Sequence, residues 1–144
     1  MPFLNATPLR HALSASLLSL SLLAPILTTQ VKAAPVSAQE FQNLLKEERA
    51  WAGLSSKSLR VGDVSWVYSE GGSTDKPTVL LIHGLAGSRD NWNRVARYLT
   101  PYYHVIIPDL PSNGETKVAD NFDLSVPNVT ERLRRFVEAI NVET

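Results

Sequence analysis

The sequence predicts an α/β fold in which parallel strands lie buried between helices. Residues 78–82 and 103–108 are apolar without alternation, as strands covered on both faces are. Between them lies the pattern of an amphipathic helix capped by Ser88 or Asp90. Its apolar face is expected to contain Trp92, Val95, Ala96 and Leu99. Strand, helix and strand in this order predict a parallel pair joined by a right-handed crossover.

The flanking segments predict two further helices and a hairpin. Ser37 and Glu40 stand at capping-box spacing, so a helix is expected over about residues 38–52. Apolar and polar residues alternate on either side of Gly62-Asp63, which predicts two antiparallel strands with glycine first in the turn. A last helix is expected to start at Ser125 and to carry one apolar stripe: Val126, Val129, Leu133, Phe136, Val137 and Ile140. The long link before it, residues 110–124, is of a length that is often functional.

The first 33 residues have the layout of a secretory signal peptide. Arg10 and His11 precede an apolar stretch at residues 12–27, and small residues near Ala33 suit cleavage. A membrane-spanning helix needs about 20 apolar residues. The apolar stretch at residues 12–27 is shorter, so an uncleaved membrane anchor is the weaker alternative. We therefore expect an exported chain, periplasmic or extracellular, with a signal peptide at residues 1–33 and a single domain at residues 34–144.

Composition and motifs argue against several classes of function. Fourteen basic and 14 acidic residues cancel, which gives no basic footprint for nucleic acid. The chain has no cysteine, and none of its three histidines has a partner at metal-ligand spacing. It also lacks phosphate-loop and dinucleotide-binding motifs. We expect no metal, no cofactor, no disulfide and no nucleic-acid partner, and no oligomeric state is predicted.

The stretch TVLLIHGLAGSRDNW places a glycine turn directly after the first buried-type strand. In open α/β sheets the carboxyl ends of the strands form the edge where ligands bind. Gly84 and Gly87 would let the main chain bend there, and the backbone N–H of Leu85 would become a preorganised donor for a developing negative oxygen. In the alternative interpretation the glycines only permit a tight turn, and His83 is a structural side chain.

The ordered motifs resemble the N-terminal part of α/β-hydrolases over residues 37–144. A hairpin precedes VLLIHGLAG, a helix opens with SRDNWNRVARYL, and a strand ends in HVIIPDLP. In that family the residue after His-Gly helps to form the oxyanion hole, a role that falls on Leu85. The family's next loop commonly reads D-x-x-G-x-G-x-S. Here Asp109 and Gly114 match, whereas Ser112 and Thr116 replace a glycine and a serine.

The turn sequence HGLAGSRDNW is similar to the secreted lipase, esterase and monoacylglycerol-lipase-like branch. The resemblance implies ester hydrolysis through a serine acyl-enzyme, a small-molecule or lipid ester as substrate, and transient contact with a lipid interface. The family's G-x-S-x-G elbow, its acid and its catalytic histidine come after the fifth strand, and no such elbow occurs in residues 1–144. The chain is therefore expected to be the N-terminal portion of a hydrolase, inactive alone and with an incomplete sheet.

The family's strand order has a physical consequence for this chain. There the fourth strand lies between the second and third, and the fifth pairs with the other side of the third. Without a fifth strand, residues 78–82 would form a bare apolar edge. His83 and Asp109 are interpreted as structural residues, since the family's catalytic histidine and acid come later. Trp66, Trp92 and Tyr103 are interpreted as core or near-core aromatics.

Two other interpretations of function stay open. In the first, the chain is a non-catalytic exported binding module built on half a hydrolase fold, and this module needs a partner to cover its bare strand edge. Alternatively, the nucleophile is an aspartate, as in the dehalogenases and epoxide hydrolases of the same fold.

Overall fold

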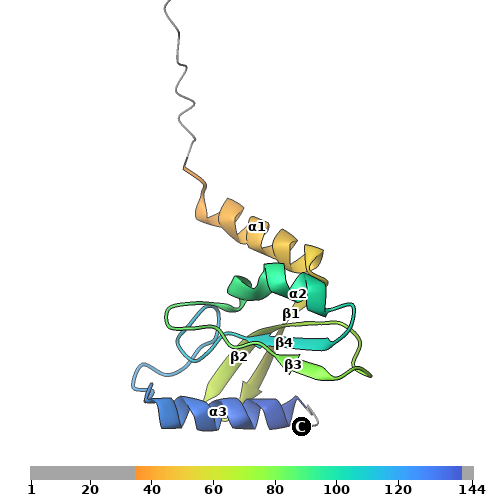
Figure 1. Cartoon of the computed structure of the whole chain (residues 1–144). Coiled ribbons are helices and arrows are strands. Elements are labelled where there is room, and N and C mark those ends of the chain that lie inside the picture. Colours follow the sequence, from red (N-terminus) through yellow and green to blue (C-terminus); the bar gives the residue numbers. More distant parts are fainter. Residues whose placement is uncertain (1–34, 141–144) are drawn as a thin grey trace, which may run out of the picture. The chain divides into compact units, whose positions relative to one another are not determined.

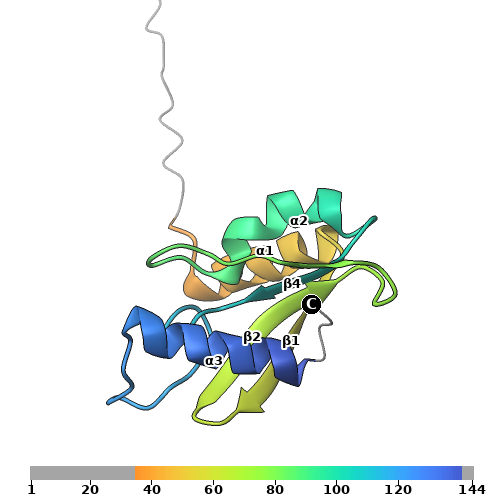
Figure 2. The same ribbon diagram turned by 60° about the horizontal axis from the view of Figure 1, so that its bottom comes forward.

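The protein forms a four-stranded sheet between two layers of helices, as Figures 1 and 2 show for the computed structural model, which describes residues 35–140. The strands are β1 (Leu54–Val61), β2 (Val64–Gly71), β3 (Thr78–Leu80) and β4 (His104–Pro108). Helices α1 (Ala38–Trp51) and α2 (Asn93–Leu99) lie on one face, and α3 (Val126–Ala139) lies on the other. The predicted signal peptide lies outside the described residues.

The hairpin is confirmed and is longer than the alternation alone suggests. β1 and β2 pair antiparallel from Leu54–Gly71 to Val61–Val64. Gly62 opens the turn with a φ of 59°, a left-handed conformation that glycine adopts at no steric cost. β1 lies at one edge of the sheet, and its exposed Ser and Lys side chains suit an edge strand.

The parallel pair is confirmed as well, with the sheet order β1-β2-β4-β3. β4 lies between β2 and β3 and is buried along its whole length, as its unbroken apolar run predicts. β3 differs from the expectation, because only three residues pair and all are half-buried. An edge strand has one neighbour, and so short an edge is a poor template for pairing with another chain.

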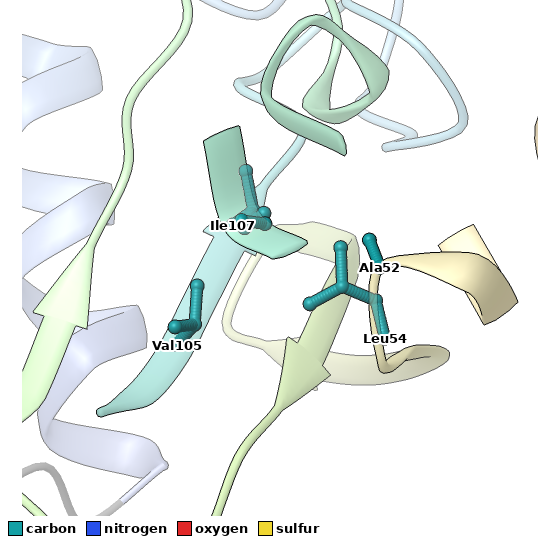
Figure 3. Close-up of a cluster of buried hydrophobic side chains, with 5 residues drawn as sticks. Ala52, Leu54, Val105 and Ile107 are labelled. Carbon is teal, nitrogen blue, oxygen red and sulfur yellow. The ribbon is translucent and has the colours of Figure 1, made fainter. Parts of the chain in front are cut away.

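Two apolar cores form, one on each face of the sheet. Towards α1 and α2, Val105 and Ile107 of β4 pack with Ala52, Leu54 and Ala96 (Figure 3). On the α3 side, Ile106 packs with a second cluster of Val64, Trp66, Tyr68 and Phe136. The Trp66 and Phe136 rings stack with centroids 4.6 Å apart, and both side chains are fully buried. Alternate residues of β4 thus join the two helical layers.

The helices follow their predicted ranges closely, but three side chains of the chain are more exposed than predicted. The Ser37–Glu40 capping box is present at the start of α1. α2 is preceded by a 3-10 turn, η1 (Arg89–Trp92). Val95 is exposed, and the buried residues of α2 are Asn93 and Ala96. Val126 is exposed in the first turn of α3, and Tyr103 is more than a third exposed. Within residues 35–140, no helix is both long and apolar enough to cross a membrane.

Replacing Phe136 by alanine should remove the main contact between α3 and the sheet. We expect Phe136→Ala to lower the free energy of unfolding by about 3–5 kcal/mol, the usual cost of deleting a buried aromatic ring. Val126→Ala, on the exposed side of the same helix, should change it by less than about 0.5 kcal/mol. Urea unfolding followed by circular dichroism measures both variants. Equal effects would contradict the assignment of Phe136 to the core.

Candidate active site

A cavity of about 580 Å³ opens at the carboxyl end of the parallel strands. The HGLAG turn forms one wall, the loop after β4 forms another, and the first turns of α3 form the third. Aliphatic side chains line most of it: Ile82, Leu85, Leu110, Leu124, Val129 and Leu133. This is the edge of the sheet at which an open α/β fold binds its ligands.

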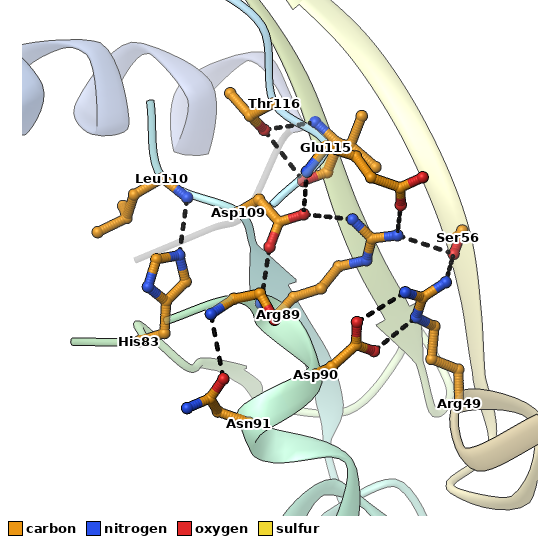
Figure 4. Close-up of polar contacts among 12 residues, drawn as sticks. Arg49, Ser56, His83, Arg89, Asp90, Asn91, Asp109, Leu110, Glu115 and Thr116 are labelled. Atoms are coloured by element: carbon orange, nitrogen blue, oxygen red, sulfur yellow. Dashed lines mark hydrogen bonds and ion pairs between the residues drawn. The ribbon is translucent and has the colours of Figure 1, made fainter. Parts of the chain in front are cut away.

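His83 ties the glycine turn to the loop after β4. Its Nε2 accepts a hydrogen bond from the backbone N–H of Leu110 at 3.0 Å (Figure 4). The proton is therefore on Nδ1, which donates to the carbonyl oxygen of Gly84 at 2.8 Å. The side chain is buried and both ring nitrogens are used. His83 thus has no free nitrogen with which to accept a proton from a nucleophile.

The turn itself leaves Leu85 free. Gly87 N–H donates to the carbonyl oxygen of Gly84 at 3.1 Å, which closes the turn. Among the described residues the backbone N–H of Leu85 has no hydrogen-bond partner, and its side chain is fully exposed. The left-handed residue is Ala86, with a φ of 55°, rather than either glycine. Gly87 sits in a tight space, because a Cβ there would lie 3.2 Å from the His83 ring and 3.1 Å from the Gly84 oxygen.

Asp109, at the end of β4, anchors the segment that follows the turn. Its carboxylate accepts the backbone N–H of Arg89 at 2.7 Å and the N–H of Glu115 at 2.9 Å. The Arg89 guanidinium forms ion pairs with both Asp109 and Glu115 (Figure 4). The side chains of Arg89 and Asp109 are each 1% exposed, so this pair is buried. Asp109 is therefore fully occupied in holding two loops together.

A second ion pair connects α1 to the same region. Arg49 donates from Nε and Nη2 to the two carboxylate oxygens of Asp90 at 2.6 and 2.7 Å. Burial raises the pKa of Asp90, but hydrogen bonds from Arg49 and Asn93 outweigh it and hold that pKa below its ordinary value of 3.8. The hydrogen bond to Asp90 likewise raises the pKa of Arg49 against the opposing effect of burial.

The loop after Asp109 keeps a tight course despite its two departures from the family pattern. Ser112 stands in place of a glycine and adopts a left-handed φ of 64°. Thr116 stands in place of a serine, and its hydroxyl accepts the N–H of Val67 at 2.9 Å. Gly114 is essential, because its φ is 51° and a Cβ would lie 2.2 Å from the Asp109 carboxylate. The loop therefore wraps closely around that carboxylate.

The ionic network of Arg49, Arg89, Asp90 and Glu115 is absent from the sequence-based expectations. Its signal was the Arg-Asp dipeptide directly after the glycine turn, since charged residues next to a buried strand need partners. Their partners are up to 41 residues away along the chain, so only the fold shows the pairing. In the described part of the chain no three His, Cys, Asp or Glu side chains form a group able to hold a metal ion.

Comparison with known proteins supports the α/β fold. Residues 77–144 match the family model of the alpha/beta hydrolase fold. Lipase 1 of Psychrobacter immobilis is 38% identical over 100 residues, which are 68% of this chain and 31% of that lipase. The structure of a lipase candidate (lip1) from Acinetobacter baumannii AYE is 68% identical with a TM-score of 0.72, and the match covers 77% of this chain and 37% of that protein.

A membrane phospholipase A described as a bacterial virulence factor also matches, with 41% identity and a TM-score of 0.70 over 73% of this chain and 34% of the phospholipase. The chain belongs to the α/β-hydrolase family, with lipases among its relatives. It spans about a third of the length of these relatives and corresponds to their N-terminal portion.

Gly114→Ala should be far more costly than Gly62→Ala. Both glycines have left-handed φ values, but a Cβ on Gly62 meets nothing within 4 Å. Gly62→Ala should therefore cost about 1–2 kcal/mol of backbone strain alone. Gly114→Ala must in addition displace the Asp109 carboxylate and expose the Arg89 pair, for a total of about 4–6 kcal/mol. Urea unfolding gives both values, and similar losses would contradict the close wrapping of the loop.

Asp90→Asn should change how stability depends on pH. The pKa of Asp90 is lowered in the folded state, so its contribution is complete above 3.8 and is lost as pH falls through the folded-state value. At neutral pH the substitution should cost about 3 kcal/mol, as for breaking one partner of a largely buried pair. The difference between wild type and variant should shrink as pH falls below 3.8 and through the lowered folded-state pKa.

Urea unfolding across that pH range measures the Asp90→Asn difference. Asp120→Asn is the control, because Asp120 is exposed and makes no hydrogen bond or ion pair within residues 35–140. A difference that stays constant with pH would contradict the role assigned to the Asp90 charge.

Proposed function

We propose that the chain carries the oxyanion-hole part of an exported carboxylic-ester hydrolase of lipase or esterase type. The observation that carries the proposal is the free backbone N–H of Leu85, on a turn that forms one wall of an aliphatic cavity of about 580 Å³. The lipase relatives support ester chemistry in particular. The domain division, a signal peptide at residues 1–33 and a hydrolase segment at residues 34–144, belongs to the same proposal.

The proposed chemistry is acyl transfer to a serine. The hydroxyl oxygen attacks the ester carbonyl carbon while a base takes the hydroxyl proton and later passes it to the departing alcohol oxygen. The carbonyl π electrons move onto the carbonyl oxygen, which becomes an oxyanion. The N–H of Leu85 donates a hydrogen bond to this oxyanion, and the electrons then return and expel the alcohol. A donor of this kind typically lowers the barrier by about 3–4 kcal/mol.

The residues of this chain would divide between charge stabilisation and support. Leu85 supplies the donor, while His83, Gly84 and Gly87 shape the turn that presents it. The nucleophile, its base and the acid would come from a segment corresponding to the later part of the longer relatives, because His83 and Asp109 are both committed to structural hydrogen bonds. The aliphatic lining would suit the hydrocarbon portion of a lipid ester.

A chimera tests the role of Leu85. Residues 34–144 would be joined to the remaining part of the Acinetobacter baumannii lipase candidate, with which the chain shares 68% identity. Leu85→Pro removes the N–H, so kcat for a nitrophenyl ester should fall by about 100- to 1,000-fold with little change in KM. The matched control is Leu85→Ala, which keeps the N–H and removes only an exposed side chain; its kcat should stay within about threefold of the parent.

Two outcomes would contradict the proposal. A Leu85→Pro chimera that melts at the parent's temperature and keeps its kcat would exclude Leu85 as an oxyanion donor. A folded parent chimera without activity on any ester would exclude the ester-hydrolase assignment for this segment.

A further inference from the structure

Helix α1 lies outside the residues matched by the family model, which begin at 77, yet it contacts the segment that follows the HGLAG turn. Arg49, in the last turn of α1, binds both carboxylate oxygens of Asp90 (Figure 4). Each side chain is only 11% exposed. A two-pronged bond between a guanidinium and a carboxylate fixes their relative orientation as well as their distance.

The HGLAG turn is held at its ends. At the amino end, Leu81 N–H donates to the Ile106 oxygen at 2.9 Å, and the His83 ring accepts from Leu110. At the carboxyl end, Arg89 is held by Asp109 and Asp90 is held by Arg49. Leu85 and Ala86 make no hydrogen bond with any described residue. The position of the Leu85 N–H therefore depends on the Gly84–Gly87 bond that closes the turn and on these end anchors.

The two carboxyl-end anchors come from different elements and have different effects. Asp109, directly after β4, binds residue 89, and Arg49 of α1 binds residue 90. A peptide segment held at one residue can still rotate about that point, whereas one held at two successive residues from two directions has a fixed orientation. η1 is only four residues long, so its own hydrogen bonds supply little stiffness.

We propose that Arg49 is a positioning residue for the oxyanion turn, acting through Asp90. This inference rests on the proposed function of Leu85, and it gives α1 a role in positioning the proposed oxyanion donor. The docking of α1 itself does not depend on Arg49. Thr100 Oγ1 donates to the Ala52 oxygen at 3.0 Å, and the Ala52 side chain is buried in the apolar core. Loss of Arg49 should therefore loosen the turn while α1 stays in place.

Backbone order parameters from NMR relaxation of the full 144-residue chain test this inference. In the wild type, Leu85 and Gly87 should have values near about 0.85, typical of rigid backbone. In Arg49→Met they should fall below about 0.6, while Ile106 in β4 and Ala96 in α2 keep their wild-type values. Arg49→Lys keeps the charge but loses the two-pronged bond, and it should give an intermediate loss. If Arg49→Met does not fold, the order parameters of Arg49→Lys decide the test.

The matched control is Arg94→Met. Arg94 pairs with Glu48 at 3.6 Å and so also connects α2 to α1, but its side chain is 85% exposed and, within residues 35–140, no hydrogen bond or ion pair joins its side chain to the turn. Its order parameters at Leu85 and Gly87 should equal those of the wild type. Unchanged values in both Arg49 variants, or a loss spread evenly over the chain, would overturn the inference. Because no substrate is present, this result is independent of the ester-hydrolysis test of Leu85.

Discussion

The buried ion pair between Arg89 and Asp109 is the interaction on which the rest of the site depends. Removing two charges from water is costly, and further hydrogen bonds to the carboxylate help the attraction between the charges to offset that cost. Here Asp109 receives three further constraints: the N–H of Arg89, the N–H of Glu115 and a tight wrap by Gly114. The pair is therefore stable only when the glycine turn and the loop after β4 are both in their native places.

That dependence explains how the glycine turn is held in place although the strand before it, β3, is short. β3 contributes only three paired residues and lies at the border of the sheet, so it gives the turn little support by itself. The support comes instead from polar contacts made by its neighbours: His83 to the next loop, Arg89 to the end of β4 and Asp90 to α1. Within residues 35–140 the backbone N–H of Leu85 has no hydrogen-bond partner, as the proposed role of oxyanion donor requires.

The loop after β4 shows how a family pattern is kept by conformation rather than by identity. Ser112 adopts the left-handed backbone conformation that favours glycine, at a cost of about 1–2 kcal/mol. Thr116 keeps a hydroxyl and bonds β2 through Val67. Only Gly114 is irreplaceable in geometry, because a side chain there would occupy the position of the Asp109 carboxylate. The departures thus fall where the backbone tolerates them, and the match falls where it does not.

The sequence by itself determined most elements of this protein and predicted where its candidate site would lie. Period-two and period-3.6 patterns, an unbroken apolar run, a capping box and a glycine turn are local features, so they place β1, β2, β4, α1 and α3 to within a few residues. Only the tertiary structure decided which charges pair, how β3 is shortened at the border, and that Val95 and Val126 face solvent. These outcomes depend on residues distant in the chain, since burial and ion pairing are properties of the assembled surfaces rather than of any local pattern.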